Sequence, residues 1–183
     1  MSSNSLHACY REALEELERK GRLRSLSPRQ GIDFTSDDYL ELAASERLRS
    51  AVMAALSCGV AVGAGGSRLL RGNSPEHEAL EAHAAEFFRA ERSLFFASGY
   101  VANYAVLSTL PQAGDLVILD ELCHASAREG ARAGRATVSR ARHNDLEHFG
   151  EIIRDWRSRG GAGRVWLGVE SLYSMDGDRA PLK

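Results

Sequence analysis

After residue 90, the pattern of hydrophobic and polar residues predicts strands that alternate with helices. Short runs typical of buried strands occur at Ser93–Ala97, Asp115–Asp120 and Arg164–Val169, and Thr137–Ala141 is a further candidate strand. Helical stretches lie between them at Tyr100–Leu110, at Ala125–Arg135 and from Asp145 onward. Strands that alternate with helices are joined by crossovers, so we predict an α/β fold with a mostly parallel sheet covered by helices.

The first ninety residues instead predict helices separated by loops. An amphipathic pattern begins near Leu6 and ends at Gly21. A second helix is predicted after Ser45, and a third after Ser74, where Pro75 occupies the first helical position. The stretch Gly63–Gly72 is too rich in glycine for a helix or strand, and its spacing matches neither a dinucleotide-binding motif nor a P-loop.

The predicted strand-to-helix joint at Ser98-Gly99 is the first candidate for chemistry. Ser98 is a plausible N-cap, and Gly99 lets the backbone approach a ligand closely. A helix that begins here directs free N–H groups and a positive dipole end toward one point, which suits a phosphate. The same pattern also fits an ordinary joint between a strand and a helix.

Other polar residues are predicted to lie at the same edge of the sheet. His124 follows the strand Asp115–Asp120, and Glu170 follows the strand Arg164–Val169, just before the turn Ser174–Asp178. Ligands of parallel sheets bind beyond the carboxyl ends of the strands. Taken singly, each residue has another interpretation: a helix-capping histidine, a glutamate paired with an arginine, or a turn with no further role.

Composition narrows the classes of function. A formal charge of −2 over 183 residues argues against binding to nucleic acid or to an anionic membrane. No apolar run is long enough to span a bilayer. The three cysteines, Cys9, Cys58 and Cys123, lack any metal-binding spacing and predict reduced thiols in a cytoplasmic protein. The six histidines are scattered, so we expect no structural metal.

A set of motifs, kept in order along the chain, resembles the α-oxoamine synthases, which are pyridoxal-phosphate (PLP) enzymes of the aspartate-aminotransferase fold. The motifs are Gly65–Arg68, Pro75 with His77, Ser98–Asn103, His124–Ser126, His143–Asp145 and Ser174–Asp178. The resemblance implies that residues 1–45 form an N-terminal helix and arm. Residues 46–183 would be the first part of the large PLP-binding domain, so the fold is expected to be truncated.

The resemblance also implies roles for individual residues. Gly99 and Tyr100 match the pair whose backbone N–H groups hold the cofactor phosphate, and His124 matches the histidine that stacks on the pyridine ring and borders the substrate. Ser174 matches a serine near the phenolic oxygen of PLP, and Arg24 an arginine that meets the acyl substrate. Asp37 stands where many relatives have asparagine, and it receives no role; Glu170 likewise receives none.

The implied reaction is the decarboxylative condensation of an amino acid with an acyl thioester. The segments Arg22–Phe34 and Gly72–His77 look most like the biotin-pathway member, which joins L-alanine to a pimeloyl thioester carried by ACP or CoA. A member that joins glycine to an acetyl thioester is the alternative. Relatives form homodimers, so we expect self-association.

The lysines complicate this prediction. The mechanism needs a lysine that holds PLP as a Schiff base, and the only lysines are Lys20 and Lys183, neither in a suitable setting. We therefore expect the isolated chain to be an inactive fragment. A non-catalytic remnant that packs against a partner subunit is the further alternative.

Overall fold

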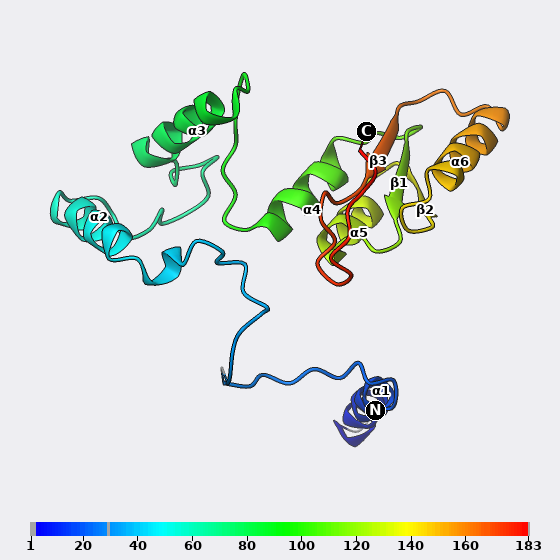
Figure 1. Ribbon diagram of the computed structural model, residues 1–183, viewed down its shortest axis with the longest axis horizontal. Helices are drawn as coiled ribbons and strands as arrows, with labels where there is room; N and C mark the ends of the chain where they lie inside the picture. The colour runs from blue at the N-terminus through cyan, green and yellow to red at the C-terminus, as the bar shows by residue number, and fades with distance from the viewer. Residues whose placement is uncertain (1–2, 29, 183) are drawn as a thin grey trace. The chain divides into compact units, whose positions relative to one another are not determined.

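The computed structural model describes residues 3–28 and 30–182, which divide into two compact units, Met1–Gly63 and Ala64–Lys183. The first unit contains helix α1 (Ser3–Arg19), the 3₁₀ helix η1 (Leu42–Ala44) and helix α2 (Glu46–Ser57) (Figure 1). The predicted domain boundary after residue 45 concerns the complete family fold and stays a prediction.

The second unit carries the α/β part of the chain. Its elements are α3 (Pro75–Phe88), α4 (Gly99–Thr109), β1 (Leu116–Asp120), α5 (Ala125–Ala133), β2 (Thr137–Ala141), α6 (Leu146–Ser158) and β3 (Val165–Gly168). The strands form one sheet in the order β2-β1-β3, and both pairs are parallel. The predicted parallel sheet is confirmed. Asp120 at the end of β1 pairs with Ala141 of β2, so the carboxyl ends of these strands meet at one edge.

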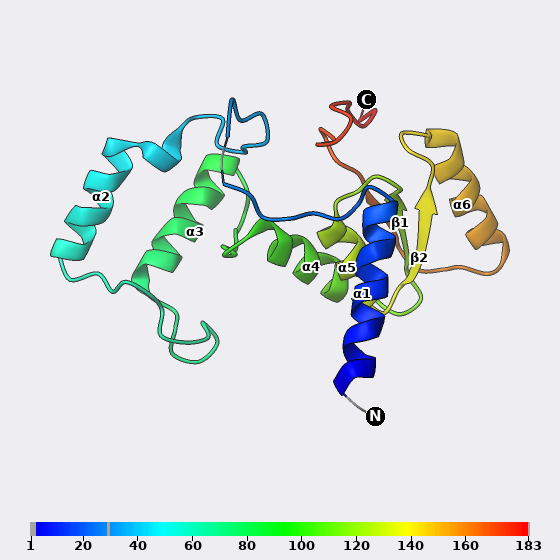
Figure 2. The ribbon, with the colours of Figure 1, turned by 90° about the horizontal axis from the view of Figure 1, so that it is seen from below.

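Both faces of β1 are covered, because successive side chains of a strand point to opposite faces. Leu116 and Ile118 pack with Phe149 of α6 in one cluster. Val117 and Leu119 pack with Ala131 of α5 in the other. Figure 2 shows α6 on one side of the sheet and α4 with α5 on the other. Every residue of β1 is buried, which makes this strand the centre of the unit.

The polar residues predicted to begin helices occupy those positions. Ser45 accepts a hydrogen bond from the Leu48 N–H at 3.4 Å, and Asp145 accepts one from the His148 N–H at 2.9 Å. At α3 the bond runs the other way, since the Ser74 N–H donates to His77 Nδ1 at 3.2 Å. These caps satisfy N–H groups that have no partner within the helix.

The prediction of a strand at Ser93–Ala97 is wrong. In the described residues this segment pairs with no strand, and Leu94 is 74% exposed. Its polar groups bond to α3 instead: the Phe95 N–H donates to the Glu81 carboxylate at 2.8 Å, and the Ser93 hydroxyl donates to the Glu81 carbonyl oxygen at 2.6 Å. A strand requires a partner for its backbone, and that partner is not among the described residues.

The stretch Tyr100–Leu110 is almost wholly apolar, which is typical of a buried helix, and this expectation is also wrong. No residue of α4 is buried, and the side chains of Tyr100 and Val101 are nearly half exposed. The helix packs along α5, and its Leu107 also reaches the cluster formed by Val117, Leu119 and Ala131. Gly130 of α5 permits the approach of the two helices, because an added Cβ would lie 2.8 Å from the Tyr104 Cα of α4.

Candidate functional site

The turn Ser98–Tyr100 presents unused N–H groups at the start of α4. Ser98 Oγ accepts a hydrogen bond from the Val101 N–H at 3.2 Å. The amides of Gly99 and Tyr100 have no acceptor among residues 3–28 and 30–182, and both residues are exposed. A Cβ on Gly99 would meet no atom of the described residues beyond its own neighbours within 4 Å, and its φ is not positive. The chain itself therefore does not require glycine here, whereas an anion bound to these amides would.

His124 lies near this turn because β1 ends just before it. It is the N-cap of α5, and its Nδ1 accepts from the Ser126 N–H at 3.2 Å. Its exposed ring stands edge-on to the Tyr100 ring, with centroids 6.2 Å apart. Asn103 of α4 donates to Ser126 Oγ at 3.0 Å and ties the two helices together. The structure thus brings the predicted residues Tyr100 and His124 together.

Glu170 connects this region to the segment that follows β3. Its carboxylate accepts a hydrogen bond from the His124 backbone N–H. Ser174 lies four residues farther along, exposed, on a turn closed by the Gly177 N–H, which donates to the Tyr173 carbonyl at 2.8 Å. Ser174 has no hydrogen bond to Gly99, Tyr100 or His124 in the described part of the chain. Its predicted place beside the cofactor stays a prediction.

A second polar cluster at the same edge was not assigned a role from the sequence. His143 Nδ1 lies 2.8 Å from Asp120 Oδ1, and His143 Nε2 lies 2.8 Å from Asp178 Oδ2. Asn144 donates its backbone N–H to Asp120 and its side-chain amide to Asp178, at 2.8 and 2.7 Å. The buried ring of Tyr173 meets the His143 ring edge-on at 4.5 Å. The only sequence signal was that two of the family motifs contain His143 and Asp178.

Electrostatics within this cluster follows from burial and hydrogen bonding. Burial alone would raise the pKa of Asp120, but hydrogen bonds from Asn144, His143 and Leu122 outweigh it and lower the pKa. The hydrogen bond to Asp120 raises the pKa of His143, opposed by desolvation and supported by the bond to Asp178. Burial raises the pKa of Tyr173 to about 12. A charged imidazole between two carboxylates is the arrangement that these directions favour.

The sequence profile described as aminotransferase class I and II matches residues 29–183. The chain belongs to this family. An 8-amino-7-oxononanoate synthase from Acidithiobacillus ferrooxidans is 42% identical over 151 residues, which are 82% of this chain and 38% of that relative. The predicted resemblance and fold class are confirmed at this level.

Solved structures give the same family assignment. A serine palmitoyltransferase from Sphingomonas wittichii matches 79% of this chain and 35% of its own, with a TM-score of 0.72 and 36% identity. Another, from S. paucimobilis with bound PLP–myriocin aldimine, matches 100% of this chain and 48% of its own, with a TM-score of 0.78 and 26% identity. The chain spans 38 to 50% of the length of the curated relatives it matches.

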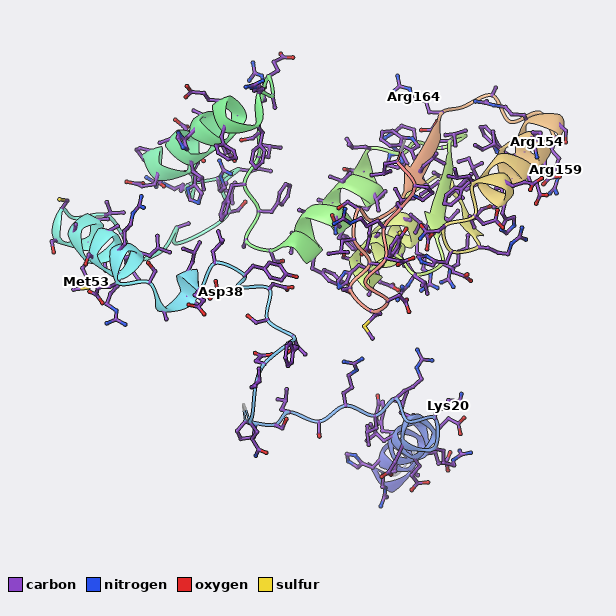
Figure 3. All side chains as sticks on the ribbon, viewed as in Figure 1. Lys20, Asp38, Met53, Arg154, Arg159 and Arg164 are labelled. Carbon is purple, nitrogen blue, oxygen red and sulfur yellow. The ribbon has the colours of Figure 1, made fainter. Side chains whose placement is uncertain are left out.

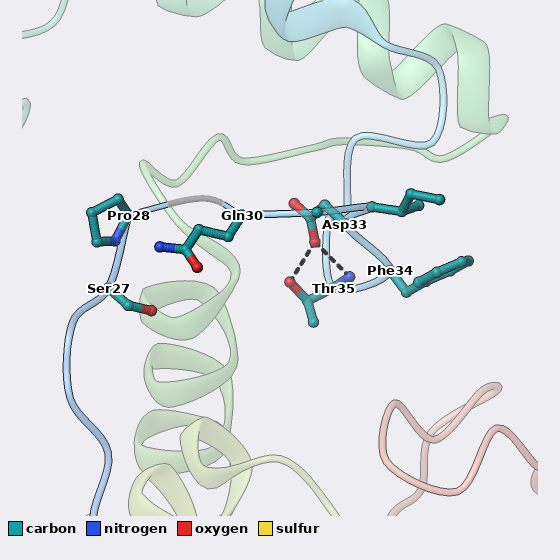
Figure 4. Close-up of a pocket in the computed structure, with 8 residues that line it drawn as sticks. Ser27, Pro28, Gln30, Asp33, Phe34 and Thr35 are labelled. Atoms are coloured by element: carbon teal, nitrogen blue, oxygen red, sulfur yellow. Dashed lines mark hydrogen bonds between the residues drawn. The ribbon is translucent and has the colours of Figure 1, made fainter.

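The remaining predicted residue, Arg24, lies in the first unit of this aminotransferase-family chain. It is exposed, in a stretch without helix or strand that follows α1. Farther along the same stretch, residues 27, 28 and 30–35 line a shallow hollow in which Thr35 donates its N–H and hydroxyl to Asp33 at 2.8 and 2.7 Å (Figure 4). One short stretch of chain forms this hollow, and we assign no ligand to it. The role of Arg24 stays a prediction.

Neither a metal centre nor a membrane-spanning helix is found in the described residues. No group of three or more histidine, cysteine, aspartate or glutamate side chains there is arranged to hold a metal ion. Among the helices of the described residues, none has the length and apolar character that crossing a membrane requires. The three thiols are unpaired, with Cys9 and Cys58 exposed and Cys123 buried.

Proposed function

We propose that this chain forms the phosphate-binding and ring-stacking part of a PLP-dependent synthase that condenses L-alanine with a pimeloyl thioester. One observation carries the proposal. The backbone N–H groups of Gly99 and Tyr100 have no acceptor in the described residues and lie at the start of α4, where the Tyr100 ring stands edge-on to the His124 ring. The amides and the helix dipole suit a dianionic phosphate. The exposed imidazole offers a flat surface for an aromatic ring.

Each residue has a binding or positioning task in this proposal. The Gly99 and Tyr100 amides donate to the phosphate, and His124 stacks on the pyridine ring. Glu170 and Ser126 hold His124 from its backbone and its Nδ1. Ser174 donates to the phenolic oxygen, and Arg24 pairs with an anionic group of the acyl substrate. PLP, when bound, supplies an electron sink for the carbanion that attacks the thioester.

The substrates follow from the relatives. The curated relative at 42% identity is an 8-amino-7-oxononanoate synthase, which favours L-alanine and a pimeloyl thioester. The 36% identity to a serine palmitoyltransferase favours a second candidate, condensation of L-serine with a long-chain acyl thioester. A glycine-using member and a non-catalytic remnant remain as further alternatives. The predicted homodimer and cytoplasmic location stay predictions.

Covalent attachment of PLP needs the amine of a lysine, so the activity of the isolated chain depends on where its lysines lie. Lys20 directly follows the charged helix α1 and is paired with Glu16 at 2.9 Å (Figure 3). Lys183 lies outside the described residues. We therefore propose that the 183-residue chain binds PLP without a Schiff base and does not turn over substrates. Borohydride reduction and peptide mapping would then find no unique lysine adduct, whereas such an adduct together with turnover would overturn this point.

The binding proposal is tested by titrating the chain with PLP and with pyridoxal, which lacks the phosphate, and following intrinsic fluorescence. We expect PLP to bind more tightly, and Gly99→Val to remove the difference by shielding the amides. Gly63→Val is the matched control, because Gly63 also has open space around its Cβ position and no positive φ. Equal affinity for PLP and pyridoxal, or an unchanged preference in Gly99→Val, would refute the proposed site.

The substrate proposal is tested in a protein that supplies the missing lysine, for instance a fusion of this chain to the second half of a related synthase. Pairs of amino acid and thioester are compared: alanine with pimeloyl, glycine with acetyl and serine with palmitoyl. We expect the alanine pair to give the highest kcat/KM. A preference for the serine pair would support the second candidate.

A further inference from the structure

His143 occupies a position between two carboxylates from distant parts of the chain. Asp120 ends the central strand β1 and is fully buried, whereas Asp178 lies on the turn after β3. Each carboxylate is 2.8 Å from a different ring nitrogen. A neutral imidazole carries one N–H and an imidazolium carries two. Only the protonated ring can therefore donate to both ionised carboxylates at once.

Asp178 is part of the turn that carries Ser174. The Tyr173 N–H donates to the Asp178 carbonyl at 2.9 Å, and the Gly177 N–H donates to the Tyr173 carbonyl at 2.8 Å. Ser174 lies between these closing bonds. A contact that pulls on Asp178 therefore acts on the whole turn, including Ser174.

The other groups around the ring leave this double contact in place. The Glu121 carboxylate accepts the His143 backbone N–H at 2.9 Å, so it does not compete for the ring. Tyr173 meets the ring edge-on, and its pKa of about 12 keeps its hydroxyl neutral. The Asn144 side-chain amide lies 3.2 Å from His143 Nε2 and donates to Asp178 Oδ2 at 2.7 Å, a bond that does not depend on the charge of the ring.

We propose that His143 is a positioning residue that, by donating to Asp120 and Asp178 together, fixes the Ser174 turn to the carboxyl end of β1. The role rests on the proposed function, in which Ser174 meets the phenolic oxygen of PLP. His143 touches neither cofactor nor substrate in this account and acts only through Asp178.

The contact of His143 with the two carboxylates should weaken as the pH rises. The hydrogen bonds to Asp120 and Asp178 raise the pKa of His143 against desolvation, so its stabilising contribution is complete below the ordinary value of 6.5. That contribution is lost as pH rises through the raised pKa. The Ser174 turn is therefore held by both anchors at low pH, and by Asn144 without His143 at high pH.

The test is an NMR titration of the 183-residue chain, which needs neither PLP nor turnover. We expect both ring nitrogens of His143 to be protonated at the low-pH end of the titration, and the midpoint to lie above 6.5. The backbone amide of Ser174 should shift with the same midpoint. In Asp178→Asn the His143 midpoint should fall, and the Ser174 amide should stop following it. In His143→Gln the Ser174 amide should show no pH-dependent shift in this range.

His83→Gln is the matched control, since His83 is exposed on α3 and its side chain makes no hydrogen bond among the described residues. It should leave the Ser174 titration unchanged. A Ser174 amide that does not respond while His143 titrates in the unaltered chain would overturn the proposal, even if every variant failed to fold. Failure of PLP to bind in a parallel titration would refute the proposed function and leave the His143–Ser174 coupling standing.

Discussion

Replacing Gly130 by alanine tests the close packing of α4 on α5, which sets the distance between the turn Ser98–Tyr100 and His124. The new Cβ would lie 2.8 Å from Tyr104 Cα, 2.9 Å from Tyr104 O and 3.1 Å from Asn103 O. All three atoms belong to the backbone of α4. They cannot rotate out of the way, so α4 itself must move.

The magnitude follows from two opposing effects. Alanine in place of glycine within a helix gains about 1 kcal/mol of stability. Overpacking against a fixed neighbour costs about 1–3 kcal/mol, and a contact with backbone belongs at the upper end. We therefore expect the free energy of unfolding to fall by about 2 kcal/mol, taking about 3 for the clash less about 1 for the gain.

The matched control is Gly150→Ala in the middle of α6. Its Cβ would lie 3.1 Å from Nη1 of Arg154, the far end of a flexible side chain that can move (Figure 3). This variant should gain about 0.5–1 kcal/mol. Urea unfolding, followed by the fluorescence of Trp156 and Trp166, measures both variants on the second unit. If Gly130→Ala were as stable as Gly150→Ala, the close approach of α4 and α5 would be refuted.

Further predictions concern the core, an ion pair and a thiol. Ile118→Ala should lower the free energy of unfolding by about 2–5 kcal/mol in the same assay, because Ile118 is fully buried against Phe149. Hydrogen bonds from the Arg68 side chain and then from the Phe95 N–H lower the pKa of Glu81 to about 2. The stability that ionised Glu81 contributes should therefore be lost as the pH falls below 4.5, and the free energy of unfolding of Glu81→Gln should fall less over the same range than that of the unaltered chain. Burial raises the pKa of Cys123 to about 11, so iodoacetamide at mildly alkaline pH should label two cysteines in the folded chain and three after unfolding.

Elements fixed by local signals were predictable from the sequence. Thr137–Ala141 forms β2 as expected, and Ser45, Ser98 and Asp145 begin their helices because short polar side chains satisfy free N–H groups wherever they precede an apolar pattern. The turn at Gly99 and the nearness of His124 also followed, because both come from the ends of predicted elements.

Elements that depend on distant partners were not predictable. Ser93–Ala97 has the composition of a strand, yet Glu81 of α3 takes its backbone bonds. The apolar sequence of α4 predicted burial, but burial depends on what packs against a helix. Here α4 lies against α5, Leu107 reaches the cluster with Val117 and Leu119, and no residue of α4 is buried. The His143 cluster was missed for the same reason. It joins residues 23 and 35 positions apart, and no local pattern marks such a contact.

The two polar clusters at the sheet edge are connected through one segment of chain. Asp120 shares a face of β1 with Leu116 and Ile118, so it points toward the α6 side, where it meets His143. His124 follows on the α5 side and is held by Glu170. The chain from Glu170 to Asp178 therefore contacts one cluster at each end, and Ser174 lies between the two contacts. If His143 acts as proposed, the position of Ser174 follows the protonation of an imidazole with which it shares no hydrogen bond in the described structure.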